Sequence, residues 1–101
     1  MSEPAQLVLK GGRMCVIGDV DFASVVALEP EGEHWLREQA PAVCHLDFSG
    51  LNRCNSAVMA LLLSWLRTAR TMDKHLVIEN IPEGLRGQMQ LAGLEDILPS
   101  G

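Results

Sequence analysis

One stretch of the chain, from Val43 to Met72, changes from a hydrophobic period of two residues to a period between three and four. The first part alternates, which predicts a strand over 43–48 with one apolar face. That face holds Cys44, Leu46 and Phe48, and the other holds Val43, His45 and Asp47. The second part predicts a helix that begins at Asn55 or Ser56 and continues to about Met72. A strand followed so closely by a long apolar helix favours a fold in which helices pack on a sheet.

Weaker signals of the same two kinds flank this stretch. Further strands are predicted over 6–10, 13–18 and 75–80. Further helices are predicted over 22–28, 30–39 and 82–91. Gly11-Gly12 joins the first two strands as a hairpin, Asp21 is the expected N-cap of the first helix, and Pro30 is expected in a first turn or a break. The apolar tail over 94–98 predicts a final strand or a helical turn.

The order of the elements predicts a single α/β domain over residues 1–101. An opening hairpin is antiparallel, and strands that alternate with helices pair in parallel through right-handed crossovers. Because the predicted strands are apolar on one face only, we expect the helices to lie mainly on one face of this mixed β-sheet.

Composition excludes several classes of function. The formal net charge of -5 argues against electrostatic binding to nucleic acid or to an anionic membrane. The first residues lack the pattern of a signal peptide, and the longest apolar run, 57–63, is too short to span a membrane. Three cysteines without Cys-x-x-Cys spacing are typical of a reducing compartment. A cytoplasmic protein without direct membrane insertion is therefore expected.

No catalytic or metal-binding pattern emerges from the residue spacing. Ser56 lacks the flanking glycines of a nucleophile elbow, and nothing singles out a base among the three histidines. The glycine-rich loops that bind nucleotides are absent, and the combination of Cys44, His45 and Cys54 matches no structural zinc site. Asp19 and Asp47 lie near strand ends, where capping and turn chemistry are the favoured roles. We expect no enzymatic activity, no cofactor and no metal.

The main helix has more apolar residues than one buried stripe requires. The stripe expected to face the sheet consists of Val58, Leu61, Leu62, Trp65, Leu66, Ala69 and Met72. Ala57, Met59, Ala60 and Leu63 are apolar but lie toward other faces. The helix is therefore either buried almost all round, or it exposes a patch at its start that docks on a partner.

The segment HLDFSGLNRCNSAVMALLLSWLRTAR resembles the central motif of STAS domains, the fold of bacterial anti-sigma factor antagonists. Leu46 to Ser49 matches the end of the family's strand, and Asn55-Ser56 occupies its Asp-Ser/Thr position. The short chain, the ALLLSWL helix and the LEDIL end resemble most closely the STAS subunits of the Mla phospholipid-transport ABC complexes of Gram-negative bacteria. Glu95 lies within that last segment.

The resemblance implies a non-catalytic cytoplasmic subunit, held at the inner membrane through its partner. That partner would be the cytosolic ABC ATPase and, through it, the membrane permease of a transporter that maintains outer-membrane lipid asymmetry. The partner-binding residues it implies are Asn55, Ser56, Ala57, Met59, Ala60 and Leu63.

The same resemblance leaves an alternative, an anti-sigma factor antagonist in which Ser56 is the phosphoacceptor. Phosphate would add charge at an interface and would be stabilised by the helix N-terminus. The chain departs from that pattern because Asn55 replaces the usual Asp, and Ala57 and Val58 follow where the family has glycine.

Overall fold

The computed structural model describes residues 4–53 and 56–91. Its strands are β1 (Gln6–Lys10), β2 (Arg13–Asp19), β3 (Val43–Asp47), β4 (Leu51–Arg53) and β5 (His75–Glu79). Its helices are α1 (Phe22–Glu38), α2 (Ser56–Thr71) and α3 (Glu83–Leu91). Within the described ranges, no helix combines the length and the hydrophobicity that crossing a membrane requires.

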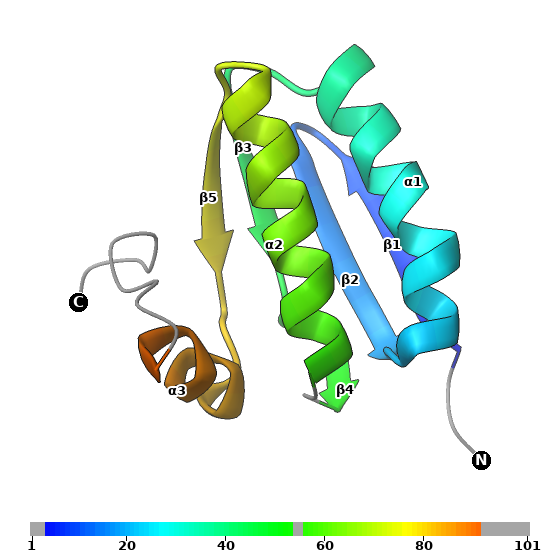
Figure 1. Cartoon of the computed structure of the whole chain (residues 1–101). Helices are drawn as coiled ribbons and strands as arrows, with labels where there is room; N and C mark the ends of the chain where they lie inside the picture. Colours follow the sequence, from blue (N-terminus) through cyan, green and yellow to red (C-terminus); the bar gives the residue numbers. More distant parts are fainter. Residues whose placement is uncertain (1–3, 54–55, 92–101) are drawn as a thin grey trace.

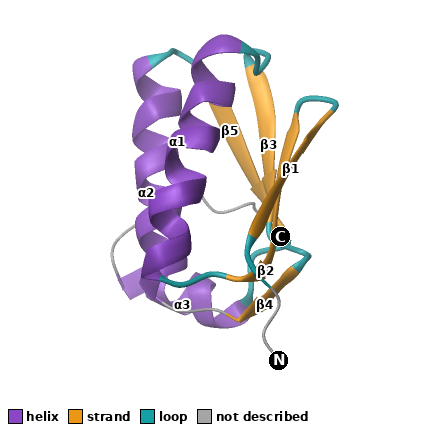
Figure 2. Ribbon diagram, turned by 90° about the vertical axis from the view of Figure 1, so that its right-hand side faces the viewer, coloured by secondary structure: helices purple, strands orange, loops and turns teal. Residues whose placement is uncertain are grey.

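The sheet is mixed, with the strand order β1-β2-β3-β5. β1 pairs antiparallel with β2, and the β2–β3 and β3–β5 pairs are parallel, as the sequence predicted. β4 pairs in parallel with the end of β2. In Figures 1 and 2, α1 and α2 lie side by side over one face of the sheet, and none of the described helices covers the other face. The predicted placement of the helices mainly on one face is therefore confirmed.

The core lies between this helical layer and the sheet, and it is mostly aliphatic. The predicted alternation of β3 is confirmed, because Cys44, Leu46 and Phe48 are buried while the side chains between them face away. From the helices, Trp65 is fully buried and packs on Gly32 of α1. A Cβ atom at Gly32 would lie 2.4 Å from the Trp65 ring. The absence of a side chain at this position therefore brings α1 and α2 close together.

The predicted break at Pro30 is wrong, because α1 continues through it. Pro30 is exposed and costs the helix one hydrogen bond, roughly 3 kcal/mol in an interior position. Burial of Leu28, Trp35 and Leu36 on both sides of Pro30 outweighs this cost.

The segment over 49–55, predicted as a connecting turn, includes a strand that the sequence did not reveal. β4 is only three residues long, which is too short for an alternating pattern of apolar and polar residues to predict a strand. Its pairing comes from β2, where Gly18 N donates a hydrogen bond to Gly50 O over 3.0 Å. The predicted tail element over 94–98 lies outside the described residues.

Candidate functional site

Ser56 is the first residue of α2, and its side chain is exposed. The first turn of the helix contains no acidic residue, so the partial positive charge of the helix N-terminus is not offset by a carboxylate there. The hydroxyl is therefore placed where a partner, or a phosphate group, could reach it. Asn55, the other residue predicted at this point, lies outside the described residues.

The remaining residues predicted to bind a partner divide into buried and exposed groups. Ala57 is fully buried on the side of α2 that faces the core, so it does not form part of the exposed surface, and its contact with a partner stays a prediction. Met59 is half-buried and packs against the core. Ala60 is exposed, and the Leu63 side chain is 37% exposed. The start of the helix is thus largely buried yet keeps Ala60 and Leu63 exposed, and docking of a partner there stays a prediction.

Two further large exposed apolar residues lie on α1. Phe22 is 64% exposed and Val26 is 76% exposed, and their spacing of four residues places them on one flank of the helix. We call Phe22, Val26, Ala60 and Leu63 together the apolar patch. The sequence analysis did not predict the α1 half of this patch. Phe22 and Val26 are four residues apart and lie off the helix face of Leu28, Trp35 and Leu36, and this spacing could have indicated a second apolar flank.

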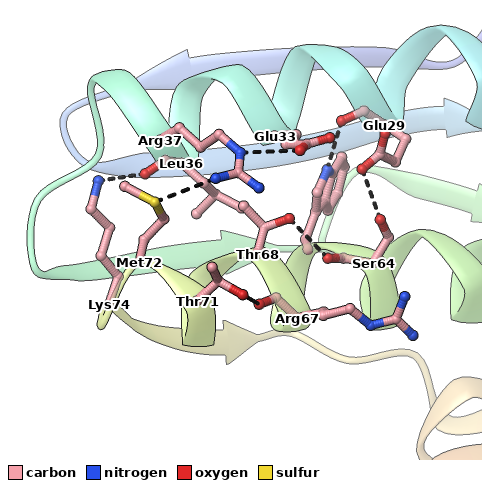
Figure 3. A network of polar contacts seen from close by, with 11 residues as sticks. Glu29, Glu33, Leu36, Arg37, Ser64, Arg67, Thr68, Thr71, Met72 and Lys74 are labelled. Atoms are coloured by element: carbon pink, nitrogen blue, oxygen red, sulfur yellow. Dashed lines mark hydrogen bonds and ion pairs between the residues drawn. The ribbon is translucent and has the colours of Figure 1, made fainter.

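Polar contacts fix how α1 and α2 lie against each other (Figure 3). The Ser64 hydroxyl donates to Glu29 Oε1 over 2.7 Å, and Trp65 Nε1 donates to the Glu29 carbonyl over 3.1 Å. Nearer the carboxyl ends, Lys74 Nζ donates to the carbonyl of Leu36. These bonds lock the register of the two helices from the middle of α1 onward.

A charged cluster occupies the open face of the sheet. Arg13 Nη1 lies 2.5 Å from Glu79 Oε1 and 3.6 Å from Asp47 Oδ2. Burial favours a higher pKa for Asp47, but hydrogen bonds from Asn80 and Ser49 and the charge of Arg13 outweigh it and lower that pKa. These contacts link three neighbouring strands of the sheet, so the cluster has a sufficient structural role.

His45 of β3 lies on this open face of the sheet, whereas Ser56 belongs to the helices on the other face. His45 Nδ1 lies 3.1 Å from Glu79 Oε1, at ion-pair distance but without an aligned hydrogen bond. Since His45 alternates with the buried residues of β3, it points away from the helical layer that contains Ser56. The fold therefore does not bring this histidine to Ser56 as a base.

The remaining predictions about polar side chains concern caps and metals. Asp21 caps α1, because its carboxylate accepts from Ser24 N over 2.8 Å while the Ser24 hydroxyl accepts from Asp21 N. The capping bonds lower the pKa of Asp21. Asp47 accepts from Ser49 N, the turn chemistry expected of it. In the described part of the chain, no group of three or more His, Cys, Asp or Glu residues could hold a metal ion.

Comparison with known proteins identifies the family. The family model described as "Mlab, STAS domain" matches residues 5–99. The chain belongs to the STAS domain family. No curated protein matches this STAS domain significantly in sequence.

Two solved structures share the STAS fold with this chain. One is the Bacillus cell fate determinant SpoIIAA in its phosphorylated form, with a TM-score of 0.73 and 17% identity over 96% of this chain and 90% of that one. The other is the anti-sigma factor antagonist SpoIIAA in its unphosphorylated form, with the same TM-score and identity, over 96% of this chain and 87% of that one. At this identity the likeness concerns the fold.

Proposed function

We propose that this STAS domain is a non-catalytic subunit that binds the cytosolic ATPase of an ABC phospholipid transporter and supports its assembly and activity. The transporter would be of the kind that maintains lipid asymmetry in the outer membrane of Gram-negative bacteria. The subunit would be cytoplasmic and reach the inner membrane only through the ATPase and the permease bound to it. Support for the transporter comes from the family model, whose description names Mlab.

The observation that carries the docking role is the exposed start of α2. Ser56, Ala60 and Leu63 face solvent at spacings of four and three residues, so they share one flank of the helix. A hydroxyl beside small and apolar side chains presents a surface that a partner can approach closely. Protein interfaces often place such groups around a buried centre.

The test is to replace Ser56 with a long charged side chain and measure binding to the purified ATPase. We expect Ser56→Arg to weaken the complex at least roughly tenfold, because an unpaired guanidinium would be forced into the contact. Thr71→Arg is the matched control: Thr71 is also exposed, but it lies fifteen residues along the same helix, about 22 Å away. Unchanged binding by a folded Ser56→Arg variant would overturn the proposal.

A second candidate function is a phospho-switch of the anti-sigma factor antagonist kind. It is favoured by the exposure of Ser56 at a helix N-terminus and by the fold shared with SpoIIAA, which has been solved with and without phosphate. Incubation with a candidate kinase should then add the mass of one phosphate to the wild type and none to Ser56→Ala. A phosphate that also appears on Ser56→Ala would lie elsewhere and would exclude this switch.

A further inference from the structure

We propose that the docking surface extends from α2 onto the first two turns of α1, and that it receives an apolar segment of the ATPase flanked by Lys or Arg. This inference rests on the proposed binding to the ATPase and adds where and what the surface binds. It is carried by the exposure, the register and the charge of the described residues of the two helices.

The two α1 residues of the apolar patch are more exposed than Leu63 of α2. Phe22 and Val26 expose 64% and 76%, against 37% for Leu63. Neither α1 side chain belongs to the buried core or to the apolar residues packed around it. Large apolar side chains left in water at adjacent turns of one helix stabilise nothing within this domain, and they are typical of a contact surface.

The register of the helices makes the two halves of the patch continuous. Glu29 and Ser64 are hydrogen-bonded, so they lie at the same level along the two helices. Val26 precedes Glu29 by about one turn, and Ala60 precedes Ser64 by about one turn. α1 and α2 run in the same direction from the same end of the domain (Figure 1). One turn back from the hydrogen-bonded pair, Val26 and Ala60 are therefore at about the same level. On α2, the exposed Ala60 lies at this level, so the two halves of the patch adjoin.

Pro30 adds a polar feature to the centre of the patch. It has no backbone N–H, so the helical hydrogen bond that would end on the carbonyl of Val26 cannot form. Acceptor capacity is therefore left at Val26, whose side chain is 76% exposed. A donor on the partner, such as the head group of Lys or Arg, would complement it.

Charge on α1 favours a basic partner. Four of the residues 22–38 are glutamates and one is Arg37, which gives four negative charges against one positive. Glu29 and Glu33 continue the flank of Phe22 and Val26 at the next turns, where the Glu29 carboxylate accepts from Ser64 and Glu33 pairs with Arg37. Because α2 has two arginines and no acidic residue, the negative charge of this surface comes from α1 alone. A second copy of this chain would bring the same glutamates against each other, so a basic segment is the better occupant.

The experiment measures the affinity of the full chain for the purified ATPase at low and at high salt. We expect Phe22→Ser combined with Val26→Ser to weaken binding about tenfold or more, because the apolar contact is lost. Val43→Ser is the matched control, since Val43 is 55% exposed on the opposite face of the sheet. Circular dichroism and thermal melting check that each variant is folded.

The charge of the partner is tested separately. Glu33→Lys should weaken binding several-fold at low salt and much less at high salt, because salt screens exposed charges. Glu38→Lys, at the far end of α1, should have little effect. Salt-independent binding together with an inert Glu33→Lys would overturn the basic segment.

Comparing Ser56→Arg with the Phe22 and Val26 double variant distinguishes failure of the α2 contact from failure of its extension onto α1. If Ser56→Arg prevents binding while the Phe22 and Val26 variant binds normally, docking on α2 stands and its extension onto α1 fails. If Ser56→Arg also binds normally, the proposed docking itself fails. Dimerisation of the free chain that is lost in the double variant would show that a second copy occupies the patch, against the proposal.

Discussion

The α1–α2 pair differs between its two ends, because one end is held by contacts between the helices and the other exposes apolar side chains. Beyond Glu29 the helices are joined by hydrogen bonds and by the close approach of Trp65 to Gly32. At their amino-terminal ends the two helices expose apolar side chains, and on α1 Val26 is more exposed than Phe22. We call these the locked end and the open end.

The difference separates residues that hold the domain together from residues that are free to bind. At the locked end Ser64, Trp65 and Lys74 donate hydrogen bonds within the chain, and the Trp65 ring is removed from water, so a substitution there should act on stability. At the open end Phe22 and Val26 keep most of their apolar area in water, so substituting them should leave stability nearly unchanged and act on binding. The predictions below test whether this division is real.

The largest effect should come from the contact between Trp65 and Gly32. Trp65→Ala should lower the free energy of unfolding by about 3–5 kcal/mol, because it leaves a cavity in the core. Gly32→Ala alone should also destabilise, by roughly 1–3 kcal/mol, because its Cβ would meet the ring at 2.4 Å. In the Trp65→Ala background the same change should become stabilising, by up to about 1 kcal/mol, since alanine is the better helix former. Urea denaturation of the four proteins measures the reversal.

Gly87→Ala in α3 is the control for helix propensity, because a Cβ there meets nothing within 4 Å. It should stabilise by a few tenths of a kcal/mol to about 1 kcal/mol in either background. A Gly32→Ala change that stabilises the wild type would show that the close contact does not constrain the locked end.

Much of the fold could be predicted because the sequence signals were local. The alternation of β3 and the apolar stripe of α2 are readable over a few residues, and burial confirms Leu46 and Trp65 as core. β4 and the continuity of α1 through Pro30 could not be read locally. The first depends on pairing with Gly18, and the second on burial on both sides of the proline.

The candidate site was predicted less well, for a physical reason. Whether Ala57 or Ala60 faces solvent depends on where α1 lies beside α2, and that is set by long-range contacts such as the bond between Ser64 and Glu29. Identical side chains three residues apart therefore have opposite exposure. Phe22 was overlooked because an apolar residue at a helix start usually packs inward.

A smaller effect at the locked end should come from the bond between Ser64 and Glu29. Ser64→Ala should destabilise by about 0.5–1.5 kcal/mol, because it removes the donor to a carboxylate while alanine recovers part of the loss through helix propensity. Thermal and urea unfolding give the difference.

The pairing is isolated by a double-mutant cycle with Glu29→Ala. The coupling energy should be roughly 0.5–1 kcal/mol. Thr71→Ala is the control, because the Thr71 hydroxyl donates to the carbonyl of Arg67 in its own helix. A coupling energy near zero would mean that the hydrogen bond does not contribute to the locked end.

The smallest effect on stability should come from the open end. Phe22→Ser and Val26→Ser should each change the free energy of unfolding by no more than about 0.5 kcal/mol, since both side chains are already mostly in water. The same variants should reduce binding to the ATPase, so stability and affinity would separate at these two residues. Urea denaturation beside the affinity measurement makes the comparison, and a loss of stability as large as that of Ser64→Ala would place Phe22 or Val26 with the locked end. The exposure of these side chains argues for the opposite result, because an apolar group can stabilise a fold only through the area that the fold removes from water.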